Sequence, residues 1–503
     1  MGKSCVHRCF STHIKYSLLF FHRIRHVNYV GSPFQNKRRF NCHSLVIFYE
    51  LIVQSVYVIC EVKDLSAQSK KIAVVGGGVS GLTAAWALSK IHEVTLFESA
   101  DYLGGHANTV IAGDGDSPPV DTGFVVFNEL NYPFFSSLLS SLGVQTLATS
   151  MSFGVSVDNG AFEYSSASLP KSLLNYSKLR SKRFRTLIAG ILRLYNPFQL
   201  RRRAVDPTLT IGEYLRHCGF KDSFIKDHVL PMTAAIWSTS LEDAEAYPVG
   251  AFFDFFNNHR LLSLFNRPSW KTIAGGSKEY IKRLVNDGNF KCLLNCRITN
   301  VRRSDKKVVL QSEDGSERNF EEVIFACHAD SVLELLSDVS SKEREILGSF
   351  AYSDNEAVLH SDSRLMPLDK QYWSSWNYVS DSTASNSDAP VHVTYWMNKL
   401  HGLDVDKQFF VTLNPIRKIK DSTVIYRTRY AHPIVGVDSV QSARQSIAIQ
   451  GQNHTWFCGA YLGAGFHEDG VQSGLWVANK LGFSSRTLPS VQYSRLPDTY
   501  ELM

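Results

Sequence analysis

The chain has 503 residues, which is more than one hydrophobic core usually serves, so we expect two domains or one domain with a large insertion. An apolar fraction of 44% and a charged fraction of 20% are typical of globular proteins and exclude a disordered chain. The net charge of +6 does not indicate a nucleic-acid partner. Eight of the basic residues lie within residues 1–49, which contain no Asp or Glu, so the rest of the chain is nearly neutral.

The first 69 residues differ in composition from the rest of the chain. Their basic, acid-free start is typical of a mitochondrial transit peptide. The apolar run Ser44–Cys60 would be a marginal membrane anchor, because it has only 17 residues and includes Glu50 and Gln54. An extension without chemical consequence, or a wrongly placed gene start, would look the same. We therefore expect an intracellular protein, cytoplasmic or mitochondrial, and leave leader, anchor and extension as alternatives.

The nine cysteines are scattered and form no CxxC pair, which favours reduced thiols and predicts no metal site. From Lys70 the pattern becomes strand, glycine turn, helix and strand, which predicts a βαβ unit. Residues 150–268 read as helices and loops, and 291–327 as strands joined by turns. A strand–glycine–helix pattern returns at 455–481, and the low-complexity stretch 380–390 predicts a surface loop.

The glycine turn GGGVSG carries a dinucleotide-binding fingerprint. Gly76 would permit the tight turn, Gly78 would let the backbone approach a pyrophosphate, and Gly81 would let the helix pack on the strand. The helix N-terminus at Val79 and Ser80 would direct free N–H groups at the phosphates. The sequence therefore predicts that this turn binds a dinucleotide.

The segment after the second strand indicates which dinucleotide is bound. Glu98 ends that strand, where an acid can accept hydrogen bonds from ribose hydroxyls. Gly104 and Gly105 come next, then Thr109, and this second glycine pair resembles the extended motif of FAD-binding proteins. Only one fingerprint occurs, so no separate NAD(P)H domain is predicted. The site is therefore interpreted as an FAD site.

With these motifs, the chain from about Lys70 to Leu481 resembles the FAD-dependent amine-oxidase-like flavoproteins. Within that superfamily it is most similar to predicted oxidoreductases that also form the N-terminal half of plant cyclopropane-fatty-acid synthases. The stretches that carry the resemblance are GGGVSGL, YLGGHANTV, DTGFVVFN, RPSW, VIFACHAD, TYWMN, VTLNP and WFCGAYLGAGFHEDGVQSG. The resemblance implies an α/β fold, with a Rossmann-like FAD-binding domain of the glutathione-reductase type and an inserted mixed α+β substrate domain.

The resemblance also implies domain boundaries. The FAD-binding domain would be discontinuous, over residues 70–150, 270–335 and 425–483. The substrate domain would comprise residues 151–269 and 336–424, and residues 484–503 would form a tail.

Further cofactor contacts are implied by the resemblance alone. Asp121 to Gly123 would border the flavin ring, and the helix starting near Gly470 would direct its first N–H groups at the N1/O2 edge, where reduced flavin carries negative charge. The implied FAD-binding residues beyond those named above are His106, Ile298, Gly459, Gly463, Gly465, Asp469, Gly470 and Val471.

Two positions depart from the family pattern. His106 stands where many relatives have Arg, and Ala460 where many have an acid that bonds the ribityl chain or pyrophosphate. No cysteine lies between Cys327 and Cys458, in the region where monoamine oxidases attach flavin covalently. We therefore expect FAD to be bound non-covalently.

Among polar residues near the implied flavin, His467 is the candidate for substrate contact or proton transfer, with orientation of its loop as the alternative. Glu468 is interpreted as a helix cap and His328 as an ordinary residue at a strand end. The expected reaction is oxidation or desaturation of a hydrophobic, lipid or fatty-acyl-type substrate by hydride transfer to flavin N5. The alternatives are a flavin-dependent isomerase and a non-catalytic FAD-binding partner of a separate fatty-acid-modifying methyltransferase.

A basic stretch bears on how a lipid would arrive. No acidic residue occurs from Tyr164 to Val205, whereas residues 171–203 mix Lys and Arg with apolar residues at helical spacing. This composition is typical of an amphipathic helix on an anionic membrane, and a solvated basic face is the alternative. We therefore expect peripheral membrane contact through residues 171–203.

Overall fold

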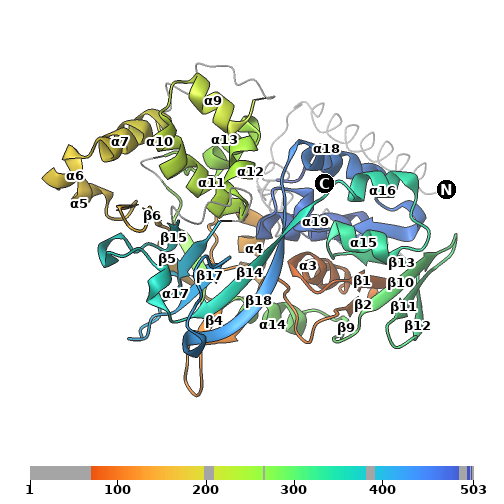
Figure 1. Cartoon of the computed structure of the whole chain (residues 1–503). Helices are drawn as coiled ribbons and strands as arrows, with labels where there is room; N and C mark the ends of the chain where they lie inside the picture. Colours follow the sequence, from red (N-terminus) through yellow and green to blue (C-terminus); the bar gives the residue numbers. More distant parts are fainter. Residues whose placement is uncertain are drawn as a thin grey trace, which may run out of the picture. The chain divides into compact units, whose positions relative to one another are not determined.

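The computed structural model describes residues 69–196, 209–263, 267–380, 391–485, 495–498 and 500. The N-terminal stretch 1–68, the arginines at 201–203 and the loop 381–390 lie outside these ranges. Figure 1 shows the described part, whose elements group around two sheets. No helix among the described residues is both long enough and apolar enough to cross a bilayer.

The first sheet is parallel, with strand order β19-β13-β1-β2-β9. Its central strand is β1, with the sequence KIAVV. The four residues after Lys71 are all apolar and buried, as expected of a strand covered on both faces. Its strands are β1 (Lys71–Val75), β2 (Glu93–Phe97), β9 (Lys291–Leu293), β13 (Glu322–Phe325) and β19 (Thr455–Phe457).

Helices and a small meander complete this first domain. Helix α3 packs on α19, and a β-carbon on Gly474 would lie 2.4 Å from the Ser80 carbonyl oxygen, so the two helices approach closely. The helices are α3 (Val79–Leu88), α4 (Pro133–Ser141), α14 (Lys278–Asp287), α15 (Ala329–Leu335), α16 (Ser341–Leu347), α18 (Val437–Gln445) and α19 (His467–Lys480). The meander comprises β10 (Ile298–Arg303), β11 (Val308–Ser312) and β12 (Glu317–Phe320).

The second sheet has seven strands in the order β18-β14-β17-β16-β15-β6-β7, and all its pairs are antiparallel except β15 with β6. Its strands are β6 (Phe153–Val157), β7 (Phe162–Ser165), β14 (Tyr352–His360), β15 (Trp376–Val379), β16 (Val393–Trp396), β17 (Phe410–Leu413) and β18 (Val424–Pro433). Two further antiparallel pairs complete the strands. The strands β3 (Thr109–Ile111) and β4 (Pro119–Asp121) are neighbours in sequence, whereas β5 (Thr146–Thr149) pairs with β8 (Trp270–Ile273) across the intervening helical group.

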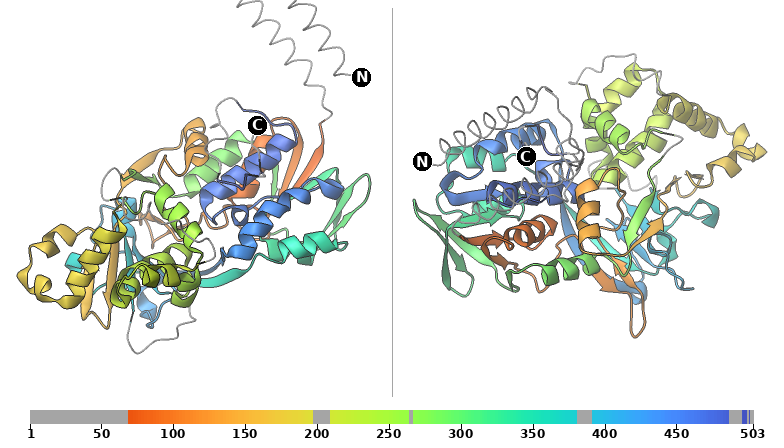
Figure 2. Two further views of the ribbon diagram at one scale, coloured as in Figure 1. Left: turned by 90° about the horizontal axis from the view of Figure 1, so that it is seen from above. Right: turned by 180° about the vertical axis from the view of Figure 1, so that it is seen from behind.

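A helical group accompanies the second sheet, and Figure 2 shows it from two further sides. It shares a hydrophobic core with β6, β7, β15 and β16, separate from the core of the first sheet. Its helices are α5 (Leu169–Leu173), α6 (Tyr176–Arg180), α7 (Lys182–Leu194), α9 (Ile211–His217), α10 (Asp222–Phe224), α11 (Leu230–Trp237), α12 (Leu241–Ala246) and α13 (Val249–Asn258), with one π-helical turn at Ile225–Val229. Helix α17 (Met397–His401) comes after β16.

The structure shifts two of the domain boundaries implied by the resemblance. Residues 425–433, assigned to the FAD-binding domain, lie in β18, which pairs with β14 along its length in the second sheet. Residues 336–350, assigned to the substrate domain, belong to the first domain, because Leu336, Ile346, Leu347 and Phe350 are buried in its core. Both boundaries lie where the chain passes from one sheet to the other. The amino-acid composition does not change at these points, so the sequence gives no signal for the crossing.

Candidate active site

A cavity of 910 Å³ lies between the two sheets, with walls from both domains. This volume is at the upper end of what small-molecule and cofactor sites occupy. From the first domain come the glycine turn after β1, the end of β2, the start of β10 and the turn before α19. From the second come β6, α11, α13 and the strands β15 to β18.

The glycine turn forms one end of the cavity. Gly76 has φ +111°, and a β-carbon there would lie 2.8 Å from the Ala326 backbone, so the turn requires glycine. A β-carbon on Gly81 would lie 2.0 Å from the Gly76 carbonyl oxygen, which fixes the close packing of helix on strand. A β-carbon on Gly78 meets no atom within 4 Å, because this residue faces the cavity. Helix α3 thus presents an uncapped N-terminus, at Val79 and Ser80, to an open space that suits an anion.

Glu98 and the second glycine pair close on the same turn. The Glu98 carboxylate accepts hydrogen bonds from the N–H groups of Gly77 (2.7 Å) and Ala100 (2.8 Å), which hold it at the cavity wall. Gly104 donates its N–H to the Gly77 carbonyl at 2.8 Å, and both Gly104 and Gly105 line the cavity. The structure therefore brings together the two glycine segments that the sequence predicted would share one ligand.

Other predicted contacts also line this cavity. They are His106, Ile298, Gly459, Gly465 and His467. Thr122 and Gly123 line it as well, whereas Asp121 does not. The buried Asp121 carboxylate instead accepts hydrogen bonds from Ser277 and from the Thr109 hydroxyl, so it fixes the β3–β4 pair against the start of α14. Thr109, predicted to contact FAD, therefore serves this internal network and lies outside the cavity wall.

The C-terminal helix begins earlier than the sequence predicted. The predicted start was near Gly470, but α19 begins at His467, so the N–H groups of Asp469 and Gly470 donate to the Phe466 carbonyl and are not free for a ligand. The Asp469 carboxylate accepts the N–H groups of Ala464 and Phe466 and pairs with Arg495 at 3.2 Å.

Four predicted cofactor contacts consequently lie behind the wall rather than in it. A β-carbon on Gly470 would lie 2.7 Å from a Val79 methyl group, so this glycine serves the packing of α19 on α3. A β-carbon on Gly463 would lie 2.6 Å from the Asp469 carboxyl carbon, and Val471 is fully buried in the core. The residues of this turn that reach the cavity are Gly459, Ala460, Tyr461, Ala464, Gly465, Phe466 and His467.

The predicted catalytic residue His467 is held by neighbours within the protein. Its ring stacks on Phe124 with centroids 3.8 Å apart and planes at 10°, and its Nε2 shares a hydrogen bond of 2.8 Å with the Tyr280 hydroxyl. Burial lowers the pKa of His467 to about 3, so the ring is neutral. These contacts match the alternative of an orienting role.

Glu468, predicted as a helix cap, caps a different helix: its carboxylate accepts the N–H groups of Phe134 and Phe135 at the start of α4.

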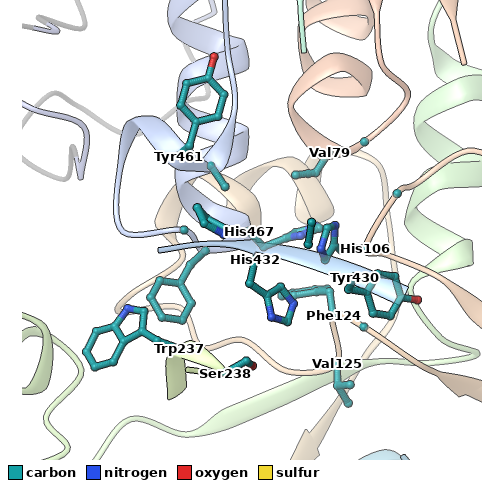
Figure 3. A pocket seen from close by; sticks show the side chains of 18 of the residues that line it. Val79, His106, Phe124, Val125, Trp237, Ser238, Tyr430, His432, Tyr461 and His467 are labelled. Carbon is teal, nitrogen blue, oxygen red and sulfur yellow. The ribbon is translucent and has the colours of Figure 1, made fainter. Parts of the chain in front are cut away.

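The middle of the cavity has a cluster of histidines that sequence reasoning missed as a group. His106 lies beside His432 and His328, with ring centroids 5.4 and 6.2 Å away, and stacks obliquely on Tyr430 at 4.8 Å. Figure 3 shows His106, His432 and Tyr430 together on this wall. Burial, reinforced by the neighbouring histidines, lowers the pKa of His106 to about 3, and burial lowers that of His432 to about 4. The sequence signal for this cluster was that Tyr430 and His432 are alternate residues of one strand, so both side chains point to the same face of the sheet.

The far end of the cavity is built from side chains rather than backbone. Trp237 and Ser238, at the end of α11, lie across the view from Val79 in Figure 3. The apolar and aromatic residues that line this end are Met151, Phe153, Met232, Ile236, Trp237, Phe255, Leu261, Trp270, Trp376, Tyr395, Val411 and Leu413. Most of these residues could not be singled out from the sequence, because an aromatic residue in a helix or strand is expected equally in a core.

The comparisons with known proteins agree with this geometry. The family described as flavin containing amine oxidoreductase matches residues 79–408. The chain belongs to this family. It is therefore a member of a family of FAD-dependent oxidoreductases, and its cofactor is FAD.

Individual relatives share little sequence identity with this flavoprotein. The Flavin-dependent L-tryptophan oxidase RebO of Lentzea aerocolonigenes is 26% identical over 235 residues, which are 44% of this chain and 44% of that protein, so the chain spans less than half the length of this relative. Among solved structures, a CLA-producing fatty acid isomerase from P. acnes has a TM-score of 0.57 at 14% identity, covering 82% of this chain and 98% of that one. Cyclohexylamine oxidase from Brevibacterium oxydans IH-35A has a TM-score of 0.55 at 13% identity, covering 82% and 99%. At these identities the two structures show the fold alone.

The residues of the first domain fit FAD. Gly78 leaves the space that a pyrophosphate needs beside the α3 N-terminus, and Glu98 is fixed where it can accept ribose hydroxyls. The buried Nε2 of His106 has no hydrogen-bond partner among the described residues, although the ring lines the cavity. A bound flavin would supply the missing partner for this nitrogen, which otherwise carries a desolvation cost.

Proposed function

We propose that this flavoprotein oxidises or desaturates a hydrophobic, lipid-type substrate that carries an acidic head group. The observation that carries the proposal is the apolar and aromatic lining of the cavity end formed by the second domain. A long hydrocarbon chain gains about 0.8 kcal/mol for each CH₂ group buried there, so such a lining favours an extended apolar substrate. When bound, the flavin supplies a two-electron acceptor for the substrate C–H bond.

The charges around this end support an acid over an amine. The acidic residues among the described cavity lining are Glu98 and Glu334, and both belong to the first domain, on β2's end and on α15. Among the described residues, a protonated amine would therefore find no carboxylate at the apolar end. Arg267 lines this end, is exposed, and has no carboxylate partner among the described residues, so its guanidinium can pair with a substrate carboxylate.

The histidines at this end add no competing charge. Burial and the nearby Arg267 lower the pKa of His228 to about 4, and its two ring nitrogens face the hydroxyls of Tyr164 (2.9 Å) and Tyr195 (3.4 Å). Burial lowers the pKa of His259 to about 3. Neutral rings neither repel Arg267 nor bind a carboxylate strongly, so the arginine is the anchoring charge that we assign to the head group.

The test is anaerobic titration of the full-length flavoprotein with three ligands of equal chain length: a long-chain fatty acid, its methyl ester and the corresponding primary amine. We expect the acid to bleach the flavin absorbance, the ester to do so more weakly, and the amine to have no effect. Bleaching by the amine alone would refute the lipid-acid substrate. Double-bond migration in the acid, seen only after the flavin has been reduced chemically, would identify an isomerase instead, and no response to any ligand would favour the non-catalytic partner.

A further inference from the structure

The helices α5, α6 and α7 leave an unusual number of large apolar side chains in solvent. The stretch from Leu173 to Leu192 includes five of the exposed large apolar residues of the described chain: Leu173 (41% exposed), Leu174 (88%), Tyr176 (70%), Leu179 (38%) and Leu192 (59%). Figure 1 shows these helices, in yellow, at the outer end of the helical group. A cluster of exposed apolar side chains on a folded protein marks a surface that another phase or partner covers.

Helix α7 is well packed, whereas α6 has no buried residue. Helix α7 is amphipathic, and its inner face buries Phe184, Leu187, Ile191 and Leu194 in the core of the second domain. Helices α6 and α7 are also properly capped, by the side chains of Asn175 and Ser181. Leu192 therefore lies on the opposite, solvent-facing side of a well-packed helix. The other four exposed apolar residues lie in α5 and α6 or between them.

Basic side chains are interleaved with these apolar ones. Arg180, Lys182 and Arg185 are exposed, and none has a carboxylate partner among the described residues. Arg183 differs from these three residues. Its guanidinium pairs with Asp227 and Asp158, so its charge is neutralised within the protein. Since no Asp or Glu occurs from Tyr164 to Val205, the surface has no internal counter-charge.

We propose that residues 173–192 form a docking surface for an anionic phospholipid bilayer. The exposed leucines and Tyr176 would enter the boundary between head groups and acyl chains, while Arg180, Lys182 and Arg185 would pair with lipid phosphates. Each basic side chain near such a surface contributes about 1 kcal/mol of attraction, and each buried apolar side chain adds a hydrophobic contribution. The combination of both types on one surface is what an anionic membrane matches.

A second copy of this chain is a poorer occupant of the same surface. In a two-fold dimer each patch faces the same patch on its partner, which would set Arg180, Lys182 and Arg185 against the like charges of the other copy. A bilayer instead supplies phosphates opposite the arginines and hydrocarbon opposite the leucines. The charge of the surface therefore favours the membrane.

In sequence, the docking helices lie between two residues of the cavity wall. Tyr164, just before α5, and Tyr195, just after α7, both line the cavity, so the docking helices are bounded in sequence by two of its wall residues. The inference goes beyond the proposed reaction and does not depend on it, because vesicle binding is measured without substrate.

The test is flotation of the full-length FAD-loaded protein with vesicles of phosphatidylcholine alone and with about 30 mol% phosphatidylserine. We expect flotation with the anionic vesicles, weakened by salt. Neutralising two charges in Arg180→Gln/Lys182→Gln should lower the affinity about 30-fold. Removing two apolar groups in Leu174→Ser/Tyr176→Ser should lower it at least about tenfold, and this loss should persist in high salt.

Matched control variants are available on the first domain. Leu294→Ser changes a leucine that is 39% exposed, and Lys306→Gln/Lys307→Gln removes two exposed charges, without touching α5 to α7. Both should float as the unaltered protein does, and all variants should retain flavin absorbance as evidence of folding. The proposal is overturned if the full chain does not float, if both patch variants float unchanged, or if light scattering shows a dimer that the patch variants dissociate.

Discussion

The two domains contribute to one cavity by different means. The first presents backbone: an uncapped helix N-terminus and glycines that lie against one another at Gly76, Gly78, Gly104 and Gly105. The second presents side chains, mostly large and apolar, from helices and from a seven-stranded sheet. A backbone surface binds the part of a ligand that is the same in every relative, whereas a side-chain surface can change with the substrate. The difference separates cofactor binding from substrate choice within one space.

The largest expected effect comes from two glycines of the GGGVSG fingerprint, Gly78 in the turn and Gly81 in the first turn of α3. Gly81→Val places a side chain against the Gly76 carbonyl oxygen, 2.0 Å from the β-carbon position, so it should prevent the helix from packing and abolish folding. Gly78→Val has free space, so the protein should fold but lose FAD, because the side chain fills the pyrophosphate position. Circular dichroism and the flavin absorbance per protein separate the two outcomes. Full retention of FAD by Gly78→Val would contradict the assignment of this turn to the cofactor.

Acid should destabilise both domains together. Burial is the main cause that lowers the pKa to about 3 or about 4 in six histidines: His106, His228, His259, His360, His432 and His467. In the unfolded chain their pKa is about 6.5, so below that pH the unfolded state binds protons that the folded state does not. The stability that these histidines contribute is therefore complete above pH 6.5 and is lost as the pH falls toward 4.

Two buried acids work against this trend, because burial raises the pKa of both Glu468 and Asp469. Burial raises the pKa of Glu468 to about 7, so its protonation favours the folded state as the pH falls from 7 towards its unfolded value. The six histidines outweigh the two acids, and we expect the free energy of unfolding to fall by several kcal/mol between pH 6.5 and 4. Calorimetry across this pH range measures the change in the free energy of unfolding. The variant His360→Gln should make that free energy depend less steeply on pH. A single transition would show the domains unfolding as a unit, and a melting temperature independent of pH would refute the neutral histidines.

The same contrast explains what could be predicted from sequence. Gly76, Gly78 and Glu98 were placed correctly at the cavity because a backbone turn of this kind leaves a fixed spacing in the chain. Trp237 and Phe255 could not be placed, because an apolar side chain looks the same whether it faces a core or a cavity.

The start of α19 was misjudged for a local reason. Gly470 looked like the first residue of a helix aimed at the flavin, but its lack of a side chain serves the contact with Val79. The helix could begin at His467 because the Asp469 carboxylate accepts the N–H of Phe466, the residue before the helix. The capping role of Asp469 could be recognised only once the first turn of α19 was located in the structure.

A smaller effect should test the side-chain half alone. Arg267→Gln removes an exposed cation from the lining of the apolar end, so it should leave flavin content and melting temperature unchanged. The preference for a fatty acid over its methyl ester in the anaerobic titration should fall about tenfold, because a charge-assisted contact is lost at a partly solvated site. Arg302→Gln, an exposed arginine of the meander, is the matched control. An unchanged preference would remove Arg267 from substrate recognition.

The smallest expected effect concerns a contact within the first domain, beside the cavity wall. Tyr280→Phe deletes the hydroxyl that shares a 2.8 Å hydrogen bond with His467, leaving a buried ring nitrogen without that partner. We expect a loss of about 1 kcal/mol in the free energy of unfolding, as for Tyr500→Phe, whose hydroxyl bonds Ser446 within the first domain's core. If His467 only orients the wall, the rate of flavin reduction by an accepted substrate should stay within about twofold in both variants. A fall of about 100-fold in Tyr280→Phe alone would instead mark the pair as a proton-transfer unit.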